Sequence, residues 1–179
     1  MNQTAKVVLE KLNKQGYQAY LVGGYPRDNY LGRNTDDLDI CTNAPFEVIN
    51  SLFQIKKTNY GASVIIIDGI EIELTQFRKE SDYQNHRFTK TIEYVNDLKT
   101  DLLRRAFTIN TLCIDKDGKE IDLLGAKKDM DNRIIRSVGD ASTKLEEDAL
   151  RILRAIRFAT ILNFEIDLEL SKAIIKHKN

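Results

Sequence analysis

Three aspartates fall within four positions of the segment NTDDLDICT, at residues 36, 37 and 39. Its DLDIC part alternates charged and apolar residues, which is typical of a β-strand, where residues two apart share one face. We therefore expect Asp37 and Asp39 to project together, with Leu38 and Ile40 turned into the core. Two neighbouring carboxylates repel each other unless a cation lies between them, and Mg²⁺ takes one or two such ligands together with substrate phosphates. For an isolated D-x-D pattern, a solvated strand end is the commoner interpretation.

A glycine pair precedes these acids by one predicted helix. In YLVGGYPRD a predicted strand runs into Gly23 and Gly24, and Pro26 can open a helix that extends to Leu31. Glycines let backbone N–H groups approach phosphate oxygens, and a helix start favours anions. The guanidinium of Arg27 has the fork geometry that pairs with a phosphate. Most Gly-Gly pairs are simple turns, but the glycine pair, the arginine and the D-x-D pattern together favour a phosphate-binding site.

A third acid lies on a predicted hairpin. The segment SVIIIDGIEIELTQF has Asp68 and Gly69 as a two-residue turn between β-branched runs. Glu71 and Glu73 alternate with apolar residues after the turn, so both point to one side. Either belongs beside the aspartates if this strand neighbours theirs, and for Glu71 a solvent-facing position is the preferred interpretation.

The composition limits the classes of function. Lysine plus arginine and aspartate plus glutamate each number 27, so the net charge does not point to a nucleic-acid partner. Acids concentrate at 36–39, and arginines at 104–105 and 151–157, which indicates a local site. No run of about 18 apolar residues exists and the N-terminus lacks a signal-peptide core, so we expect no membrane association. Cys41 and Cys113 are far apart and lack metal-site spacing, which favours a reduced, cytoplasmic setting.

Predicted strands and helices mix through about residue 140, and from about Ser142 the pattern is helical to the end. This pattern predicts an α/β domain joined to the start of a helical one. The polar segment RKESDYQNHRFTKT has no periodicity and is predicted to be a loop.

Five longer segments occur in an order typical of one family. They are LVGGYPRDNYLGRNTDDLDICTNAPFEVINSLF, ELTQFRKESDYQNHR, DLLRRAFTINTL, IDLLGAKKDMDNRIIRSVGD and EEDALRILRAIRFA. Together they resemble the class II nucleotidyltransferases, which comprise the tRNA CCA-adding enzymes and the bacterial poly(A) polymerases close to them. The resemblance implies an α/β fold, a nucleotidyltransferase head with a mixed β-sheet flanked by helices over residues 1–140. An all-helical neck segment over residues 141–179 is expected to follow, with the family's body and tail domains absent.

The resemblance also implies roles for individual residues. Asp37 and Asp39 are the expected Mg²⁺ ligands, and Glu73 aligns with a third catalytic carboxylate. The residues expected to bind the nucleotide are Gly23, Gly24, Arg27, Arg104, Arg105, Asn110, Asp148, Arg151, Arg154 and Arg157. His86 and His177 receive no catalytic role, because nucleotidyl transfer requires no covalent enzyme intermediate.

Within this set, Asp148 and Arg151 are expected to read the base, and Arg154 and Arg157 to hold phosphates or the helix end. On one continuous helix these four residues form a slanted ridge. The opposite, buried stripe is expected to contain Ala149, Ile152, Leu153 and Ile156. A carboxylate and a guanidinium complement the amino donor and ring-nitrogen acceptor that cytosine and adenine both present, so one pair can accept both bases. Without the resemblance, these arginines are interpreted as a solvated face.

The implied function is the addition of CMP and AMP, from CTP and ATP, to the 3′ end of tRNA. Two alternatives stay open: a poly(A) polymerase of the same family, and a non-catalytic nucleotide- or RNA-binding remnant that needs a partner chain. The segment from Arg78 to Arg87 matches the family's flexible loop, which is linked to the switch from C to A addition, and so favours an enzyme that adds A.

Two departures from the family pattern bear on this function. Ala106 stands where the family motif Arg-Arg-Asp has an aspartate associated with the sugar hydroxyl. The chain also stops just after the neck begins, within the apolar segment ATILNFEIDLELSKAII. We therefore expect an exposed apolar surface there, with self-association or a separate C-terminal chain covering it.

Overall fold

The computed structural model describes residues 1–59 and 62–177, and its chain forms two compact units. The first unit contains Met1–Phe77, Tyr94–Leu98 and Leu112–Ile121. The second contains Arg78–Glu93, Lys99–Thr111 and Asp122–Asn179. The chain therefore passes between the units several times, and the head and neck boundary at residues 140 and 141 stays a prediction.

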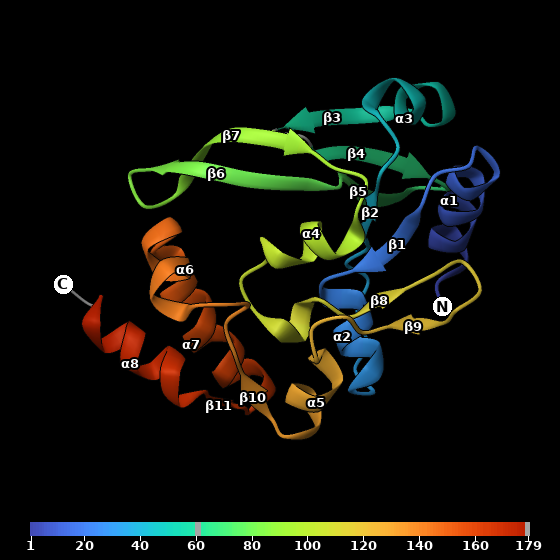
Figure 1. Ribbon diagram of the computed structural model, residues 1–179. Coiled ribbons are helices and arrows are strands. Elements are labelled where there is room, and N and C mark those ends of the chain that lie inside the picture. Colours follow the sequence, from blue (N-terminus) through green and yellow to red (C-terminus); the bar gives the residue numbers. More distant parts are fainter. Residues whose placement is uncertain (60–61, 178–179) are drawn as a thin grey trace. The chain divides into compact units, whose positions relative to one another are not determined.

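The first unit is built on a mixed β-sheet (Figure 1). Among the described residues its strand order is β3-β4-β5-β2-β1-β8-β9. The strands are β1 Ala19–Val22, β2 Asp39–Thr42, β3 Ile55–Asn59, β4 Ala62–Ile67, β5 Ile70–Gln76, β8 Cys113–Ile114 and β9 Glu120–Ile121. Strand β2 pairs with β5 in parallel, whereas its pairing with β1 is antiparallel. The mixed sheet expected from the family resemblance is confirmed.

In the described part of this unit, the helices are α1 Gln3–Lys14, α2 Gly24–Tyr30 and α3 Phe46–Leu52. Helix α1 buries one apolar face, which includes Val8, Leu9 and Leu12, in the same core as inward residues of the strands. Burial of this face, more than helix propensity, holds α1 on the sheet. The predicted hairpin is confirmed, because Asp68 and Gly69 have φ angles of 51° and 79° between β4 and β5, as a type I′ turn requires.

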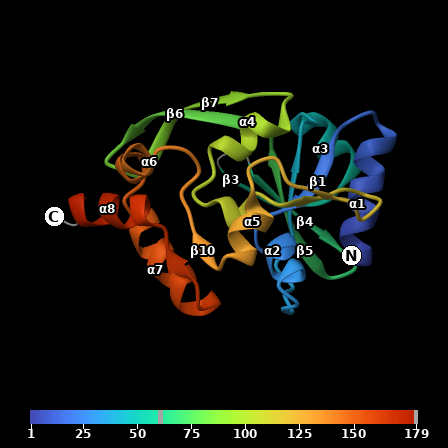
Figure 2. The same cartoon turned by 60° about the horizontal axis from the view of Figure 1, so that its bottom comes forward.

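The predicted loop after β5 is wrong. Residues Arg78–Gln84 form β6 and residues Phe88–Tyr94 form β7, and these strands pair as a two-stranded sheet (Figures 1 and 2). The turn between them contains Asn85 and His86 with φ angles of 53° and 49°. Strand β6 alternates charged and polar residues, and Lys90 interrupts the apolar alternation of β7, so the period-two hydrophobic signal of a half-buried strand is weak.

The second unit also contains the C-terminal helices seen together in Figure 2. Its remaining elements are α4 Leu98–Leu103, which starts in the first unit, η1 Thr108–Asn110, α5 Ala126–Asp131, β10 Ile134–Ile135, α6 Ala141–Glu147, α7 Leu150–Leu162, β11 Glu165–Ile166 and α8 Leu168–Lys176. The segment after residue 140 is helical as predicted, except that β11 pairs with β10 in parallel.

The continuous helix predicted from Asp148 onward is wrong. Asp148 ends α6 as its C-cap with φ −146° and ψ 102°, and α7 begins at Leu150. The side-chain carboxylate of Asp148 accepts a hydrogen bond from the backbone N–H of Leu150 at 3.0 Å. Local hydrogen bonding of this kind lets aspartate interrupt a helix. Asp148 therefore does not share a helical ridge with the arginines of α7.

The predicted buried stripe of α7 is wrong as well. Leu153 and Ile156 are 64% and 48% exposed, Ala149 is exposed, and Ile152 is half-buried. The buried residues of this helix are instead Arg151, Ala155 and Leu162. Helical periodicity identifies residues that share a face, but the neighbouring elements decide which face is buried. Two hydrophobic side chains of α8 are also exposed, Leu168 by 66% and Ile175 by 65%.

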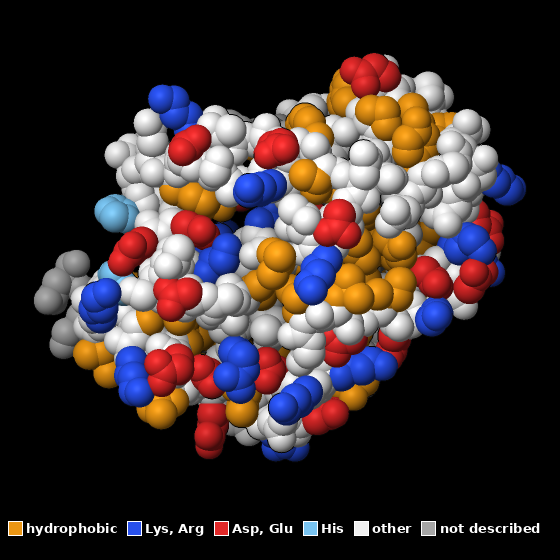
Figure 3. All heavy atoms as spheres, viewed as in Figure 1, with side chains coloured by type: hydrophobic (Ala, Val, Ile, Leu, Met, Phe, Trp, Pro, Cys, Tyr) orange, Lys and Arg blue, Asp and Glu red, His pale blue; other side chains and the backbone are white. Residues whose placement is uncertain are grey.

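Both cysteines lie in the sheet of the first unit. Cys41 of β2 and Cys113 of β8 are buried, and β1 runs between their strands. Acidic and basic side chains are interspersed over the face seen in Figure 3, in keeping with the balanced charge of the sequence. Within the described ranges, no helix has the length and apolar character needed to cross a membrane.

Candidate functional site

The glycine pair lies directly against the two aspartates of the D-x-D pattern. Gly23 follows β1 with φ 81° and ψ −128°, a conformation that L side chains rarely adopt. A Cβ atom at Gly23 would lie 3.1 Å from Oδ2 of Asp39. A Cβ atom at Gly24 would lie 3.7 Å from Oδ2 of Asp37. The absence of a side chain at Gly23 therefore lets the backbone and the Asp39 carboxylate approach each other closely.

The strand register places Glu73 beside Asp39. In the parallel pairing of β2 and β5 these two residues are opposite each other, and on the other side of β2 Val22 pairs with Asp39. Asp37 and Glu73 are exposed and Asp39 is half-buried, whereas Leu38 is 2% exposed. The structure thus brings Asp37, Asp39, Glu73 and the glycine pair to one end of the central strands.

The other glutamate of this strand has a different environment. Glu71 is exposed and forms an ion pair with Lys56 of β3. This arrangement agrees with the solvent-facing position expected for Glu71.

Arg27 joins the group through α2. Its side chain is oriented by Asp28, with Nε donating to Oδ1 at 2.9 Å and Nη2 donating to Oδ2 at 2.8 Å. Two parallel hydrogen bonds of this type fix the plane of a guanidinium. A Cβ atom at Gly24 would lie 3.7 Å from Nη2 of Arg27, and Arg27 is only 9% exposed. The guanidinium is therefore held close to the glycine pair.

The chemistry of Asp37 and Asp39 suits Mg²⁺. This ion accepts carboxylate oxygens, retains several waters, and usually takes one or two protein carboxylates plus substrate phosphates. Among the described residues, no group of three or more His, Cys, Asp or Glu side chains is arranged to hold a metal ion. Asp37 is exposed and Asp39 half-buried, so both carboxylates are accessible, as ligands of a hydrated ion of this kind must be.

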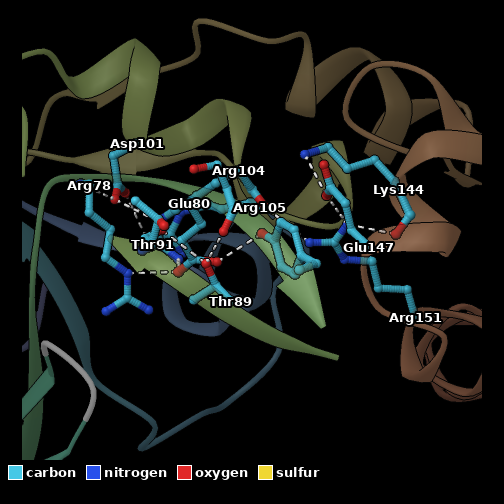
Figure 4. Close-up of polar contacts among 12 residues, drawn as sticks. Arg78, Glu80, Thr89, Thr91, Asp101, Arg104, Arg105, Lys144, Glu147 and Arg151 are labelled. Atoms are coloured by element: carbon cyan, nitrogen blue, oxygen red, sulfur yellow. Dashed lines mark hydrogen bonds and ion pairs between the residues drawn. The ribbon is translucent and has the colours of Figure 1, made fainter. Parts of the chain in front are cut away.

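The predicted residues Arg104 and Arg105 belong to the second unit, and acidic side chains hold them (Figure 4). Asp101, which is 0% exposed, accepts from Nε of Arg104 at 2.9 Å and from Nη2 of Arg105 at 3.2 Å. It also accepts from the backbone N–H of Arg78 at 3.1 Å. Both carboxylate oxygens of Asp101 are therefore engaged.

A second acid, Glu80 of β6, connects to Arg104 and to the side chain of Arg78. It accepts from Nε of Arg78 at 2.7 Å, from Nη1 of Arg104 at 3.3 Å, and from the Tyr83 hydroxyl at 3.0 Å. Burial acts to raise the pKa of Glu80, but the charges of Arg104 and Arg78 and their hydrogen bonds hold it below its usual value. Burial and the neighbouring Glu80 carboxylate raise the pKa of Tyr83. Glu80 is thus stabilised as a carboxylate.

Arg151 is buried against α6. Its Nη1 donates to Oε2 of Glu147 and to the carbonyl oxygen of Lys144, each at 2.7 Å. Its Nη2 donates to the carbonyl oxygen of Arg104 at 3.4 Å. Arg151 is consequently linked to the arginine cluster, whereas Asp148 ends the neighbouring helix.

The remaining predicted residues have different environments. Arg154 and Arg157 are exposed on α7, and Asn110 is half-buried at the end of η1. The start of η1 is fixed by Thr108, whose hydroxyl donates to the buried Asp129 carboxylate at 2.6 Å. Sequence reasoning missed the supporting acids Glu80, Asp101 and Asp129. The spacing of Asp101 three and four residues before the arginine pair was a usable signal, because such residues are neighbours around a helical turn.

Comparisons with known proteins give a consistent result. The family model of the poly(A) polymerase head domain matches residues 19–136. A CCA-adding enzyme of Bacillus pumilus (strain SAFR-032) is 42% identical over 177 residues, which cover 96% of this chain and 44% of that protein. A CCA-adding enzyme of Bacillus subtilis (strain 168) is 40% identical over 176 residues, again covering 96% of this chain and 44% of the relative.

Solved structures agree with these matches. The crystal structure of the Bacillus stearothermophilus CCA-adding enzyme in complex with CTP superposes with a TM-score of 0.89 at 35% identity, over 98% of this chain and 43% of that one. A tRNA nucleotidyltransferase complexed with a primer tRNA and an incoming ATP analog gives a TM-score of 0.77 at 29% identity, over 94% and 49%. The chain therefore spans less than half the length of these relatives.

Proposed function

Because the chain belongs to the poly(A) polymerase head-domain family, we propose that it is the nucleotidyl-transfer part of a CCA-adding enzyme. In this proposal it adds CMP and AMP, from CTP and ATP, to the 3′ end of tRNA. The observation that carries the proposal is how closely the glycine pair approaches the carboxylates: a Cβ atom at Gly23 would lie 3.1 Å from Oδ2 of Asp39, and one at Gly24 would lie 3.7 Å from Oδ2 of Asp37. This close approach supports a site in which ligands of a divalent cation lie beside backbone groups that suit a triphosphate.

Each predicted site residue of the first unit has a role in this proposal. Asp37 and Asp39 hold Mg²⁺, and Glu73 supports them as a third carboxylate. Mg²⁺ at this position supplies charge neutralisation for the triphosphate and favours deprotonation of an attacking hydroxyl. The backbone N–H groups of Gly23 and Gly24 and the guanidinium of Arg27 orient the phosphates, and positioning of this kind accounts for most of the catalysis of phosphoryl transfer.

The residues of the second unit bind the rest of the nucleotide. Arg104, Arg105 and Asn110 contact the nucleotide, and Asp148 with Arg151 reads the base. Since Nη1 of Arg151 already donates to Glu147 and Lys144, the base meets a guanidinium whose plane is fixed in advance.

The two arginines further along α7 are proposed to bind phosphates. Arg154 and Arg157 are exposed and hold phosphates of the nucleotide or of the RNA.

CCA addition is preferred to poly(A) synthesis because the similar curated proteins are named CCA-adding enzymes. A poly(A) polymerase would extend RNA with ATP alone and ignore CTP. A nucleotide-binding remnant would bind both nucleotides without incorporating either, an alternative favoured by Ala106 in place of the family's aspartate.

The test is incorporation of labelled CTP and ATP into tRNA that lacks its 3′ end, using the 179-residue chain alone and with the C-terminal part of a Bacillus relative added. We expect incorporation of both nucleotides and its loss by about a thousandfold in Asp39→Ala, because the metal site loses a ligand. Asp36→Ala, which removes the exposed neighbouring acid, is the matched control and is expected to retain activity.

Three outcomes separate the alternatives. Undiminished incorporation by Asp39→Ala refutes the metal assignment. Incorporation of ATP alone indicates a poly(A) polymerase. Binding of both nucleotides without incorporation, even with the added C-terminal part, indicates the remnant.

A further inference from the structure

We propose that Asp101 is a positioning residue, which orients the guanidinium groups of Arg104 and Arg105 for nucleotide binding. The inference rests on the proposed function, since it takes these two arginines as contacts of the nucleotide. It adds a residue that touches no substrate and acts only through the side chains that it holds.

The geometry of the Asp101 carboxylate supports this role. One oxygen, Oδ1, accepts from Nε of Arg104 at 2.9 Å, and the other, Oδ2, accepts from Nη2 of Arg105 at 3.2 Å. The two arginines follow Asp101 by three and four residues at the end of α4, so both side chains reach back over one helical turn. Arg104 is held by Nε on Asp101 and by Nη1 on Glu80, and Arg105 is held by Nη2 on Asp101, so the orientation of each guanidinium is defined.

Burial makes these contacts strong. The side chain of Asp101 is 0% exposed, and those of Arg104 and Arg105 are 15% and 17% exposed. A buried carboxylate is stable only with charged or hydrogen-bonding partners, so Asp101 and the arginines depend on one another. Hydrogen bonds to charged groups in such surroundings are shorter and stronger than neutral ones.

The cluster combines charges of both signs. Three guanidinium groups, those of Arg78, Arg104 and Arg105, share the two carboxylates of Asp101 and Glu80. The two carboxylates offset the repulsion between these neighbouring guanidinium groups. Without Asp101 this repulsion would grow, and Arg104 and Arg105 would be displaced from their present arrangement.

Asp101 also connects the arginine pair to two other parts of the second unit. Its Oδ1 accepts from the backbone N–H of Arg78, the first residue of β6. The carbonyl oxygen of Arg104 accepts from Nη2 of the buried Arg151 at 3.4 Å. A displacement of Arg104 would therefore reach the base-reading arginine as well, so loss of Asp101 is expected to weaken binding of CTP and ATP alike.

The experiment compares Asp101→Asn and Asp101→Glu in the 179-residue chain, with KM and kcat for each nucleotide, equilibrium binding of CTP and ATP, and the thermal midpoint. We expect Asp101→Asn to raise KM and the dissociation constant for both nucleotides by about tenfold, with kcat changed by less than about threefold. Asp101→Glu retains the charge and is expected to recover most of the affinity.

Asp167→Asn is the matched control, because Asp167 also pairs with an arginine of this unit, Arg136, at 2.7 Å, and asparagine retains its N-cap function for α8. We expect it to lower the thermal midpoint with little change in KM. An Asp101→Asn variant that loses stability but retains the wild-type KM and affinity overturns the proposal. If Asp101→Asn does not fold, the test uses Asp101→Glu, whose arginine environment is followed by NMR. The proposal is overturned if the NMR signals of the arginines change in the folded Asp101→Glu variant while its affinity for CTP and ATP stays that of the wild type.

The same measurements distinguish failure of the proposed function from failure of the positioning role of Asp101. If the wild-type chain neither binds nor incorporates CTP and ATP, nucleotidyl transfer itself is refuted. If the wild-type chain binds both nucleotides and the Asp101 variants bind them equally well, only the positioning role is refuted.

Discussion

The acids of the first unit and the arginines of the second are positioned by opposite means. Asp37 is exposed and Asp39 half-buried, and because Gly23 and Gly24 at the end of β1 have no side chain, the backbone lies close to both carboxylates. Arg104 and Arg105 are mostly buried, and the Asp101 carboxylate holds their side chains. One set is therefore positioned by backbone geometry and the other by ion pairs.

The difference follows from the physical chemistry of the groups. Carboxylates that receive a hydrated cation must stay accessible to water, so burying them among charged partners would oppose their role. A guanidinium has five donors in a rigid fork and can give some to the protein while others face a ligand. Backbone positioning predicts strong sensitivity to glycine substitution, and ion-pair positioning predicts sensitivity to charge and pH.

Among the substitutions that test this difference in positioning, Gly23→Ala is expected to have the largest effect. The new Cβ atom would meet Oδ2 of Asp39 at 3.1 Å, at a φ of 81°. We expect nucleotide incorporation to fall by about a hundredfold, because a displacement of about 1 Å in a catalytic group is enough for such a loss. The free energy of unfolding is expected to fall by about 1–2 kcal/mol from backbone strain.

Gly16→Ala separates these two effects. Gly16 has a similar φ of 86°, and nothing lies within 4 Å of a Cβ atom there. It should lose a comparable amount of stability in urea unfolding and keep full activity. Equal activity losses in the two variants would mean that strain, rather than contact with Asp39, is responsible.

An intermediate effect is expected from Glu80→Gln. The pKa of Glu80 is lowered in the folded protein, so its charged form stabilises the fold above its unfolded pKa of about 4.3, and this stabilisation is lost as the pH falls through the folded pKa. At pH 7 we expect Glu80→Gln to reduce the free energy of unfolding by about 1–2 kcal/mol, because Arg78 and Arg104 lose a charged partner. The difference from wild type should shrink in acid.

Glu71→Gln sharpens this comparison between buried and exposed ion pairs. Glu71 pairs with Lys56 on the surface of the first unit, with 55% of its side chain exposed. Its substitution is expected to change stability by less than about 0.5 kcal/mol at any pH from 3 to 8. Urea unfolding across that range tests both variants, and equal pH profiles would contradict the ion-pair account of the second unit.

The smallest effect is expected from Ala106→Asp, which adds a carboxylate next to the arginine pair. If the added group accepts from the ribose 2′-hydroxyl, the preference for ATP over dATP should rise by about fivefold in kcat/KM. Ala106→Asn, of similar size but without charge, is the control and should raise the preference less. An unchanged preference in Ala106→Asp would place the sugar away from this position.

The backbone-positioned region was largely predictable from the sequence. The alternation around Leu38, the glycine pair and the Asp68-Gly69 turn are local signals, because a strand period or a positive φ is determined by adjacent residues. The sequence predicted that Glu73 lies beside the aspartates only if the two strands are neighbours. It could not establish that they are, because parallel pairing joins segments that are distant in the sequence.

The region organised by ion pairs was less predictable. Strands β6 and β7 are rich in polar residues, and the local hydrogen bond of Asp148 lies at the end of α6, within a pattern that resembles one helix. The burial of Arg151 contradicts the usual rule that arginines face water, and it depends on Glu147 and the carbonyl of Lys144. Such features require tertiary partners that no short window of sequence contains.

The two buried thiols can report how often the sheet of the first unit opens. Cys41 and Cys113 lie on strands separated by β1, and two strand spacings amount to about 10 Å, beyond the reach of a disulfide. Oxidation therefore cannot form a disulfide between these two strands of one molecule. A thiol reagent can modify either sulfur only while the strands part, so the labelling rate measures how often the scaffold beneath the aspartates opens.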